Sequence, residues 1–272
     1  MPSVKLDNTN FHYRLDGPED RPLVVLSHAL SVSHAMWGFQ LPILTQHFRV
    51  LSYDMRGHGG TDATGEDLTR GYTLEQMADD VAQLAAKLGH GRFHFVGLSI
   101  GSMIGQVLAL RHTQMLNRVV LACAGTGKPN ADQQKMWEDR VAAIAKDGVA
   151  SQVDGTLGRW LSPEFRAAAP LTSEWIADLI RATPGAGYIG AALAIKRMDI
   201  PGDKLETLRL PVLCIAGEKD PGATVAAVGA LRDRIQGARL AVIEGGYHLC
   251  NVEKPHAFNE AMLGFLLEGD AD

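Results

Sequence analysis

The chain has little cysteine, few aromatic residues and no long hydrophobic run. Only 3 of its 272 residues are cysteines, and these three lie far apart. An odd, scattered set excludes a disulfide scaffold, matches no metal-ligand spacing and indicates buried, reduced thiols. No stretch approaches the roughly 18 consecutive apolar residues that span a membrane, and the Met1–Asn10 segment lacks the apolar run of a signal peptide. We therefore expect a cytoplasmic protein without a membrane partner.

A strong excess of either charge is also missing. The 26 Lys and Arg residues face 31 Asp and Glu residues, which gives a formal net charge of −5. This balance lacks the basic surface that binds phosphate backbones, so nucleic acid is excluded as a partner. Hydrophobic residues make up 46% and charged residues 21%. These proportions exclude disorder and are typical of a globular protein with a substantial core. They do not determine the oligomeric state.

Short apolar runs alternate with helical patterns toward both ends of the chain. The runs are rich in Val, Leu and Phe on both alternating positions, which is typical of parallel strands buried on both faces. The predicted strands are Leu23–Ser27, Phe48–Tyr53, Phe93–Val96, Arg118–Cys123, Pro211–Ala216 and Leu240–Ile243. Helical spacing of apolar residues predicts one helix over Leu74–Leu88, with Thr73 and Gly89 as its caps, and a terminal helix over Val252–Leu267.

The middle of the chain differs, because residues 128–204 contain no convincing strand pattern. The pattern there is helical and is interrupted by glycine and proline. A strand–helix alternation that stops for a helical insertion and then resumes predicts an α/β fold. Its central sheet is expected to be mostly parallel, with helices on both faces and an inserted helical cap. The predicted domains are a core of residues 1–127 and 205–272 and a cap of residues 128–204.

The strongest motif is the pentapeptide Gly-Leu-Ser-Ile-Gly at residues 97–101. It lies directly after a predicted strand and directly before a helical pattern, which is the context of a nucleophile elbow. Glycine on either side removes side chains that would collide in so tight a turn, and Ser99 is then held in a strained, exposed conformation. The alternative is a glycine-rich turn with an incidental serine, since the bare pentapeptide is common by chance. The strand–turn–helix context favours a nucleophile.

A serine hydroxyl needs a base to take its proton. In this type of fold, the acid and then the histidine follow the serine on loops that leave later strands. Only His248 and His256 come after the helical insertion, and His256 is expected to be a surface residue at the start of a helix. His248, on a glycine-containing loop after the last strand, is the predicted base. Asp220 is the predicted orienting acid, with Glu218 as its competitor and more simply a solvated charge.

Acyl transfer also needs two amide donors for the developing oxyanion. The N–H of Ile100, directly after the nucleophile, supplies one. The loop after the first long strand supplies the other, predicted as the N–H of Leu30. His28 in the same loop is expected to support the loop through a hydrogen bond rather than to act as a base. We predict no metal and no cofactor, because no His-Glu-x-x-His and no Gly-x-Gly-x-x-Gly opening a helix occur.

Together these segments resemble the α/β-hydrolase superfamily over essentially the whole chain, and within it 3-oxoadipate enol-lactonases and related carboxylesterases. The segments that carry the resemblance are Val25–Trp37, Tyr53–Gly59, Gly97–Gly101, Gly217–Asp220 and His248–Pro255. The resemblance implies that Ser99, Asp220 and His248 form a catalytic triad. It implies equally that Leu30 and Ile100 donate to the oxyanion, and that the partner is a small ester or lactone.

Three positions depart from the enol-lactonase pattern. His28 stands where asparagine is usual, Ser102 stands where glycine is usual, and Ser31–Ser33 replaces a small loop residue. The first and third are expected at the mouth of the pocket. The chemistry of the superfamily is therefore expected here, whereas the particular substrate of the lactonase is left open.

The predicted cap supplies candidate substrate contacts. The residues that could roof an apolar pocket, or equally form an ordinary cap core, are Met136, Trp137, Trp160, Trp175, Tyr188 and Met198. A substrate with a free carboxylate would need a cation inside the pocket, and Arg140, Arg159 and Lys196 are the candidates. We expect Trp137, Trp160, Arg140 and Tyr188 to contact the substrate.

The sequence thus predicts a serine hydrolase of carboxylic esters, lactones included. A carbon–carbon bond hydrolase or a cofactor-free haloperoxidase would use the same triad, and a panel of substrates would separate these activities. A non-catalytic ligand receptor on the same fold would bind tightly without turnover, and it has no need of an intact triad.

Overall fold

The computed structural model describes residues 2–64 and 71–268, so parts of the predicted core at residues 1, 65–70 and 269–272 lie outside it. The described residues contain one eight-stranded sheet in the order β1-β2-β4-β3-β5-β6-β7-β8. The strands are β1 (Ser3–Leu6), β2 (Thr9–Asp16), β3 (Leu23–Ser27), β4 (Arg49–Tyr53), β5 (Phe93–Leu98), β6 (Leu116–Ala122), β7 (Val212–Gly217) and β8 (Arg239–Ile243). All pairings from β4 through β3 to β8 are parallel.

The six predicted strands are present as β3 to β8, and their ends differ from the predicted ends by at most two residues. The predicted α/β fold with a mostly parallel sheet is therefore confirmed. Sequence analysis missed β1 and β2, which form an antiparallel hairpin and join the sheet by antiparallel pairing with β4. These strands lie at the edge of the sheet and carry many polar residues, so they lack the apolar runs that marked the buried strands.

The direction of the chain across the sheet reverses at β3. From β3 the chain moves to β4 past α1 (Leu41–Leu44), and from β5 it moves the opposite way to β6 through α3 (Ile100–Arg111). Right-handed crossovers in opposite directions place their helices on opposite faces of the sheet. Ser27 and Gly97 are register partners at the ends of β3 and β5, so the loops that follow these strands start side by side. Open α/β sheets bind ligands at such a reversal.

The remaining core helices pack close to the sheet. They are α2 (Leu74–Lys87), α10 (Val225–Asp233), α11 (Cys250–Glu253) and α12 (Pro255–Leu266), with short 3-10 turns η1 (His34–Trp37) and η2 (Thr113–Met115). Thr73 caps α2 by accepting a hydrogen bond from the Gln76 amide, as predicted. The single terminal helix predicted over Val252–Leu267 is wrong. Pro255 disfavours helical backbone at Lys254, whose φ is −129°, and the segment divides there into α11 and α12.

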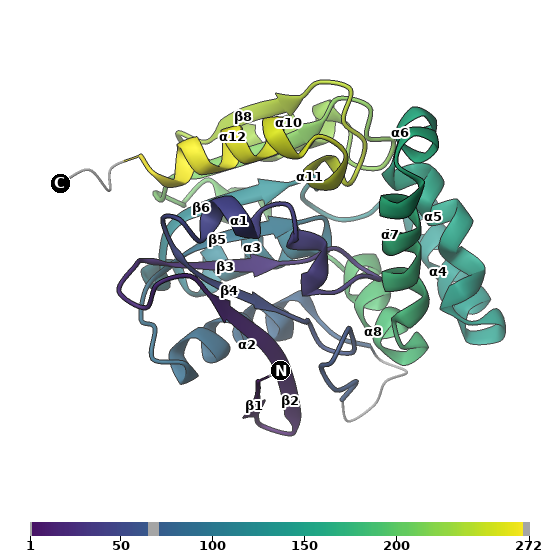
Figure 1. Cartoon of the computed structure of the whole chain (residues 1–272), viewed down its shortest axis with the longest axis horizontal. Coiled ribbons are helices and arrows are strands. Elements are labelled where there is room, and N and C mark those ends of the chain that lie inside the picture. Colours follow the sequence, from purple (N-terminus) through teal and green to yellow (C-terminus); the bar gives the residue numbers. More distant parts are fainter. Residues whose placement is uncertain (1, 65–70, 269–272) are drawn as a thin grey trace.

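A group of helices from the middle of the chain covers the carboxyl ends of the strands (Figure 1). These helices are α4 (Ala131–Asp147), η3 (Val149–Gln152), α5 (Val153–Trp160), α6 (Pro163–Ala168), α7 (Pro170–Ala182) and α8 (Gly185–Lys196). The short helix α9 (Gly202–Leu205) follows them and contacts the core helix α3. In Figure 1 the arrows of β3 and β6 point toward the teal and green cap helices. Within residues 128–204, which are all described, no strand occurs. The exact domain boundaries stay a prediction.

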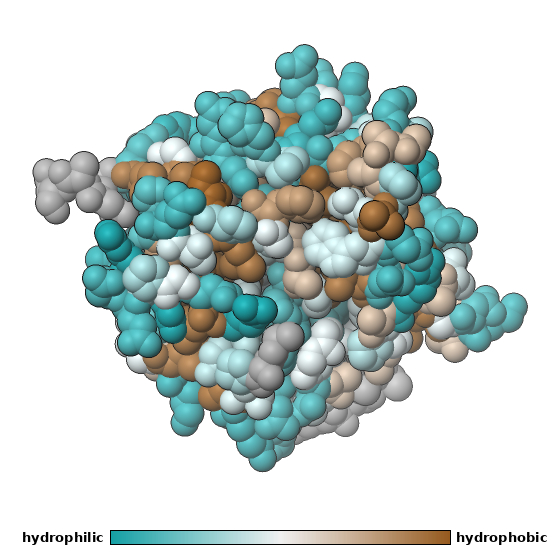
Figure 2. All heavy atoms as spheres, viewed as in Figure 1, coloured by the Kyte–Doolittle hydropathy of each residue, from teal (hydrophilic) through white to brown (hydrophobic). Residues whose placement is uncertain are grey.

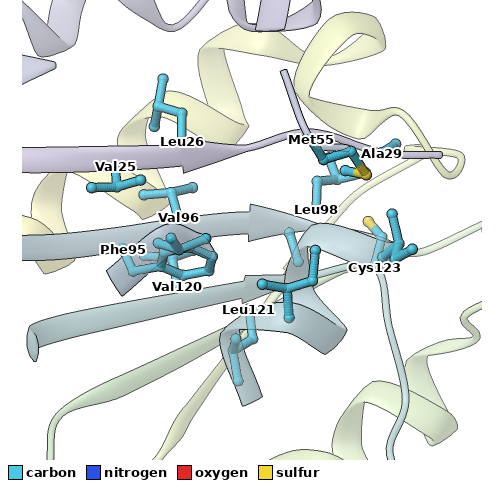
Figure 3. Close-up of a cluster of buried hydrophobic side chains, with 14 of the residues drawn as sticks. Val25, Leu26, Ala29, Met55, Phe95, Val96, Leu98, Val120, Leu121 and Cys123 are labelled. Carbon is cyan, nitrogen blue, oxygen red and sulfur yellow. The ribbon is translucent and has the colours of Figure 1, made fainter. Parts of the chain in front are cut away.

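The core of the sheet is fully buried up to the strand ends that carry the site. Val25, Phe95 and Val120 on β3, β5 and β6 are each 0% exposed, and Figure 3 shows them side by side on the three strands.

The three cysteines are buried and free, as predicted. No helix among the described residues is long and apolar enough to cross a bilayer. Figure 2 shows a mostly hydrophilic face with small, separate apolar patches.

Candidate active site

Ser99 lies in the tight turn between β5 and α3, as the pentapeptide motif predicts. Its φ of 59° and ψ of −119° are strained for a residue with a side chain. A Cβ atom on Gly97 would lie 2.2 Å from the Gly101 carbonyl oxygen, and one on Gly101 would lie 2.2 Å from the Ser27 carbonyl oxygen. Both glycines are therefore required for the close approach of the backbone segments, and the turn presents a half-buried Ser99 side chain at the strand end.

Asp220 and His248 meet on the loops that follow the neighbouring strands β7 and β8. The Nδ1 atom of His248 lies 2.7 Å from Oδ2 of Asp220. The other carboxylate oxygen, Oδ1, accepts hydrogen bonds from the amides of Gly222 at 2.8 Å and Ala223 at 3.0 Å. The Asp220 side chain is 0% exposed. The carboxylate is thus held in place from both sides, and a ring with its proton on Nδ1 has its lone pair on Nε2.

The two groups stabilise each other's charge in spite of their burial. Burial alone would raise the pKa of Asp220, but the charge of His248 and the hydrogen bonds from His248 and two backbone amides hold this pKa below its usual range. Burial alone would lower the pKa of His248, but the charge and hydrogen bond of Asp220 raise it above the usual value of 6.5. His248 is therefore a stronger base than a free imidazole.

Ser99, Asp220 and His248 line one cavity of about 430 Å³. Leu30 lines the same cavity from the loop after β3, while Ile100 begins α3 directly behind Ser99. Within the part of the chain that the structure describes, the backbone amides of Leu30 and Ile100 donate no hydrogen bond. Both amides thus remain available to a bound group, although their role stays a prediction.

The cap forms the opposite wall of the cavity. Its lining residues include Met136, Trp137, Arg140, Arg159, Trp160, Tyr188, Ile195 and Met198. All four predicted substrate contacts are therefore at this wall. Trp175 is not in the wall, because its ring packs edge-on against Phe39 with the centroids 6.1 Å apart. Lys196 also lies outside the wall, and its ammonium group pairs with Glu138 at 2.7 Å.

Two arginines face the cavity without a carboxylate partner among the described residues. Arg140 stacks over the Trp137 ring, with its guanidinium carbon 4.9 Å from the ring centroid. Arg159 donates a hydrogen bond to the Thr156 hydroxyl at 3.1 Å. Burial and the nearby charge of Arg140 lower the pKa of Arg159. Lys128 lines the same cavity, so three cationic side chains lie at its wall, and the two arginines are the ones on the cap helices α4 and α5.

His28 supports the loop after β3, as predicted. It is 0% exposed, its Nδ1–H donates to the Ala29 carbonyl at 2.7 Å, and its Nε2 accepts from the Met55 amide at 3.0 Å. Burial, reinforced by the neighbouring His58, lowers the pKa of His28 to about 3. The ring is thus neutral and joins the loop that carries Leu30 to the loop after β4.

Three potential metal ligands, His12, His34 and Asp54, converge outside the cavity within 4.8 Å of one another. Each histidine Nδ1 lies 2.7 Å from a different Asp54 oxygen. The amides of His34 and Gly60 donate to the same two oxygens, both at 2.8 Å. Ligand atoms on one tetrahedral ion lie about 3.4 Å apart when the bonds are about 2.1 Å long. The shorter distances are those of hydrogen bonds around a buried carboxylate.

Sequence analysis missed Glu253, which joins the His248 loop to the cap. The carboxylate of Glu253 is in a residue only 6% exposed. It accepts hydrogen bonds from the amide of Tyr247 at 2.9 Å and from the amide of Ser162 at 3.2 Å. Glu253 lies inside the His248–Pro255 segment that carried the family resemblance, but Ser162 is 91 residues away in the sequence and no spacing pattern indicated this contact.

Comparisons with known proteins agree with this architecture. The alpha/beta hydrolase fold family matches residues 22–255. The 3-oxoadipate enol-lactonase 1 of Acinetobacter baylyi is 29% identical, over 93% of this chain and 91% of the relative. A hydrolase from Pseudomonas aeruginosa has a TM-score of 0.91 and 35% identity, with 98% of both chains covered. The enol-lactonase from Burkholderia xenovorans has a TM-score of 0.92 and 32% identity, over 98% of this chain and 100% of its own. The chain therefore belongs to the alpha/beta hydrolase fold family and is a hydrolase.

Proposed function

We propose that the protein is a serine hydrolase that cleaves carboxylic esters and lactones through an acyl-enzyme. The observation that carries this proposal is the 2.7 Å hydrogen bond between His248 and Asp220 in the cavity that Ser99 also lines. A nucleophile, a base and an acid that orients the base are the groups that acyl transfer requires. A ligand receptor would need neither the strained serine nor the buried carboxylate.

In the proposed mechanism, Nε2 of His248 takes the proton of the Ser99 hydroxyl while Oγ attacks the carbonyl carbon. The negative charge that develops on the carbonyl oxygen is stabilised by the amides of Leu30 and Ile100 and by the N-terminus of α3. The imidazolium is stabilised by Asp220 and gives its proton to the leaving alcohol. Water then attacks the acyl-enzyme while His248 takes its proton, and His248 returns this proton to Oγ of Ser99 as the acid is released.

The test uses p-nitrophenyl butyrate, whose cleavage releases the coloured p-nitrophenolate. Ser99→Ala should lower kcat by at least roughly 10³-fold, because the residual activity of a triad without its nucleophile is small. Ser102→Ala is the matched control, since Ser102 is in the helix that directly follows Ser99 and its buried hydroxyl has no hydrogen-bond partner among the described residues. Equal rates for Ser99→Ala and the wild-type protein would refute the proposal.

We further propose that the substrate carries a free carboxylate, as an enol-lactone of 3-oxoadipate does when one of its two acid groups closes the ring. The support is the unneutralised pair Arg140 and Arg159 at the cap wall, next to the apolar surface of Trp137. Half-buried guanidinium groups at a cavity wall favour a bound anion, because each forms charge-assisted hydrogen bonds to a carboxylate. Relatives named as enol-lactonases agree with this substrate class.

Two esters of equal carbon number test the carboxylate. Mono-p-nitrophenyl glutarate ends in a carboxylate, and p-nitrophenyl valerate ends in a methyl group. Arg140→Gln and Arg159→Gln should each lower kcat/KM for the glutarate ester by roughly tenfold to hundredfold and leave the valerate ester nearly unchanged. Lys196→Gln, outside the cavity wall, serves as the control for lost positive charge. Equal losses for both esters would contradict a carboxylate site.

A further inference from the structure

Backbone strain is concentrated at the cavity. Four residues other than glycine have a positive φ among the described residues, and they are Asp7, Ser31, Ser99 and Cys123. Ser31, Ser99 and Cys123 line the cavity, whereas Asp7 lies in an exposed turn between β1 and β2. A side chain in this region is unfavourable and persists where the surrounding structure or the function demands it. The nucleophile elbow explains the positive φ of Ser99, but it does not explain the φ of 59° at Ser31.

The hydroxyl of Ser31 is unused within the described part of the chain. The residue is only 1% exposed, and its Oγ forms no hydrogen bond there. Nearby serines behave differently: the Ser27 hydroxyl pairs with the Tyr53 hydroxyl at 2.9 Å, and the Ser33 hydroxyl accepts from the Ala35 amide at 3.3 Å. Because Ser31 lines the cavity, a hydroxyl without a partner among the described residues is free to donate a hydrogen bond to a bound group.

The position of Ser31 indicates which ligand atom it meets. It directly follows Leu30, whose amide is a proposed oxyanion donor, and both residues line the cavity with Ser99. The loop is held to the segment after β4, because His28 donates to the Ala29 carbonyl and accepts from the Met55 amide. A donor on a fixed loop is already oriented before the reaction, which is the condition for electrostatic stabilisation of a transition state.

We propose that the Ser31 hydroxyl is a third oxyanion donor, beside the amides of Leu30 and Ile100. This inference rests on the proposed function. The O–H keeps its proton and donates a hydrogen bond to the carbonyl oxygen, which gains negative charge as Ser99 attacks. A hydrogen bond to a charged oxygen is stronger than one to a neutral carbonyl, so its effect falls mainly on kcat rather than on KM.

Two substitutions of Ser31 separate the effect of its hydroxyl on activity from the effect of its strained backbone. Ser31→Ala removes the hydroxyl and keeps a side chain at the strained φ, whereas Ser31→Gly removes both the hydroxyl and the strain. Both variants should lower kcat for p-nitrophenyl butyrate roughly tenfold with little change in KM. Ser31→Gly should also raise Tm, so its lost activity is not explained by poor folding. Asp7→Gly is the matched control, which relieves strain far from the cavity and should leave kcat unchanged.

Wild-type kcat in both Ser31 variants would overturn the inference. A loss of activity in Ser31→Gly alone would also overturn it, because loop conformation and not the hydroxyl would then be responsible. A rise in KM at constant kcat would overturn it too, since that pattern reports binding of the ground state. Each of these results is distinguishable from failure of the proposed function, which would show as wild-type activity in Ser99→Ala.

Discussion

Replacing Asp220 with asparagine should inactivate the enzyme by reversing the proton arrangement on His248. Oδ1 of Asp220 accepts hydrogen bonds from the Gly222 and Ala223 amides at 2.8 and 3.0 Å. An asparagine must keep its carbonyl oxygen at that position, so its NH₂ group faces Nδ1 of His248. Nδ1 must then accept a hydrogen bond, which places the ring proton on Nε2. A protonated Nε2 cannot take the proton of Ser99.

The expected loss is about 10⁴-fold in kcat, which corresponds to about 5.5 kcal/mol of lost transition-state stabilisation. The pH dependence should change as well. The rate falls as pH drops through the pKa of His248, because only the neutral ring is a base. Asp220 raises this pKa, so removal of its charge leaves burial unopposed. The acidic limb of the kcat/KM profile should therefore move to lower pH in the variant.

The assay measures p-nitrophenyl butyrate hydrolysis across a pH series for the wild-type protein, Asp220→Asn and a control. Glu218→Gln is the control because Glu218 is an exposed acid in the same loop, which accepts a hydrogen bond from the Gly245 amide at 2.9 Å. Its kcat should stay within a few-fold of the wild-type value. An Asp220→Asn protein that retains more than about a tenth of wild-type kcat, or whose acidic limb does not move, refutes the reasoning.

Two more predictions concern the structure around the site. Glu253→Gln places an NH₂ group against one of the two backbone amides that now donate to the carboxylate. The free energy of unfolding in urea should fall by about 1–3 kcal/mol, and kcat should fall too. Unchanged values of both would show that Glu253 does not hold the His248 loop against the cap. Burial lowers the pKa of His28 to about 3 and that of His58 to about 4, so the folded protein keeps both rings neutral while the unfolded chain binds protons below pH 6.5. Stability should therefore fall as pH drops below about 6.5, by about 2 kcal/mol per histidine at pH 5. His58→Asn should reduce the decline in the free energy of unfolding, measured by urea titration, by about 2 kcal/mol at pH 5, and an unaltered decline would contradict the neutral, buried ring.

The parts of the fold that were predictable from the sequence are those whose signal is local. The strand β3 was predicted over Leu23–Ser27 and occurs over those residues, because a strand buried on both faces must be continuously apolar. The nucleophile turn was predictable because steric limits at the turn allow only glycine on either side of Ser99. The β1–β2 hairpin was not, since edge strands with mixed polar residues carry no comparable pattern.

Features that depend on contacts between residues distant in the sequence were not predictable from the sequence. The apolar character of Trp175 fitted a pocket lining and a packing contact equally well, and only the position of α7 places it against Phe39. Similarly, Arg159 and Lys196 were equivalent candidates for the cation that binds a substrate carboxylate. In the structure, Lys196 instead forms an ion pair with Glu138. The burial of Glu253 and the unused hydroxyl of Ser31 depend on how the loops meet, and composition and spacing contain no record of that.

The most direct test of the central claim is covalent labelling with an alkyl fluorophosphonate, followed by peptide mass spectrometry. The reagent loses fluoride to an activated serine and forms a stable phosphonyl ester that resembles the tetrahedral intermediate. We predict a single adduct on Ser99, formed much more slowly in Asp220→Asn and absent in Ser99→Ala. An adduct on another residue, or an unlabelled Ser99 in a protein that still hydrolyses p-nitrophenyl butyrate, would contradict the account.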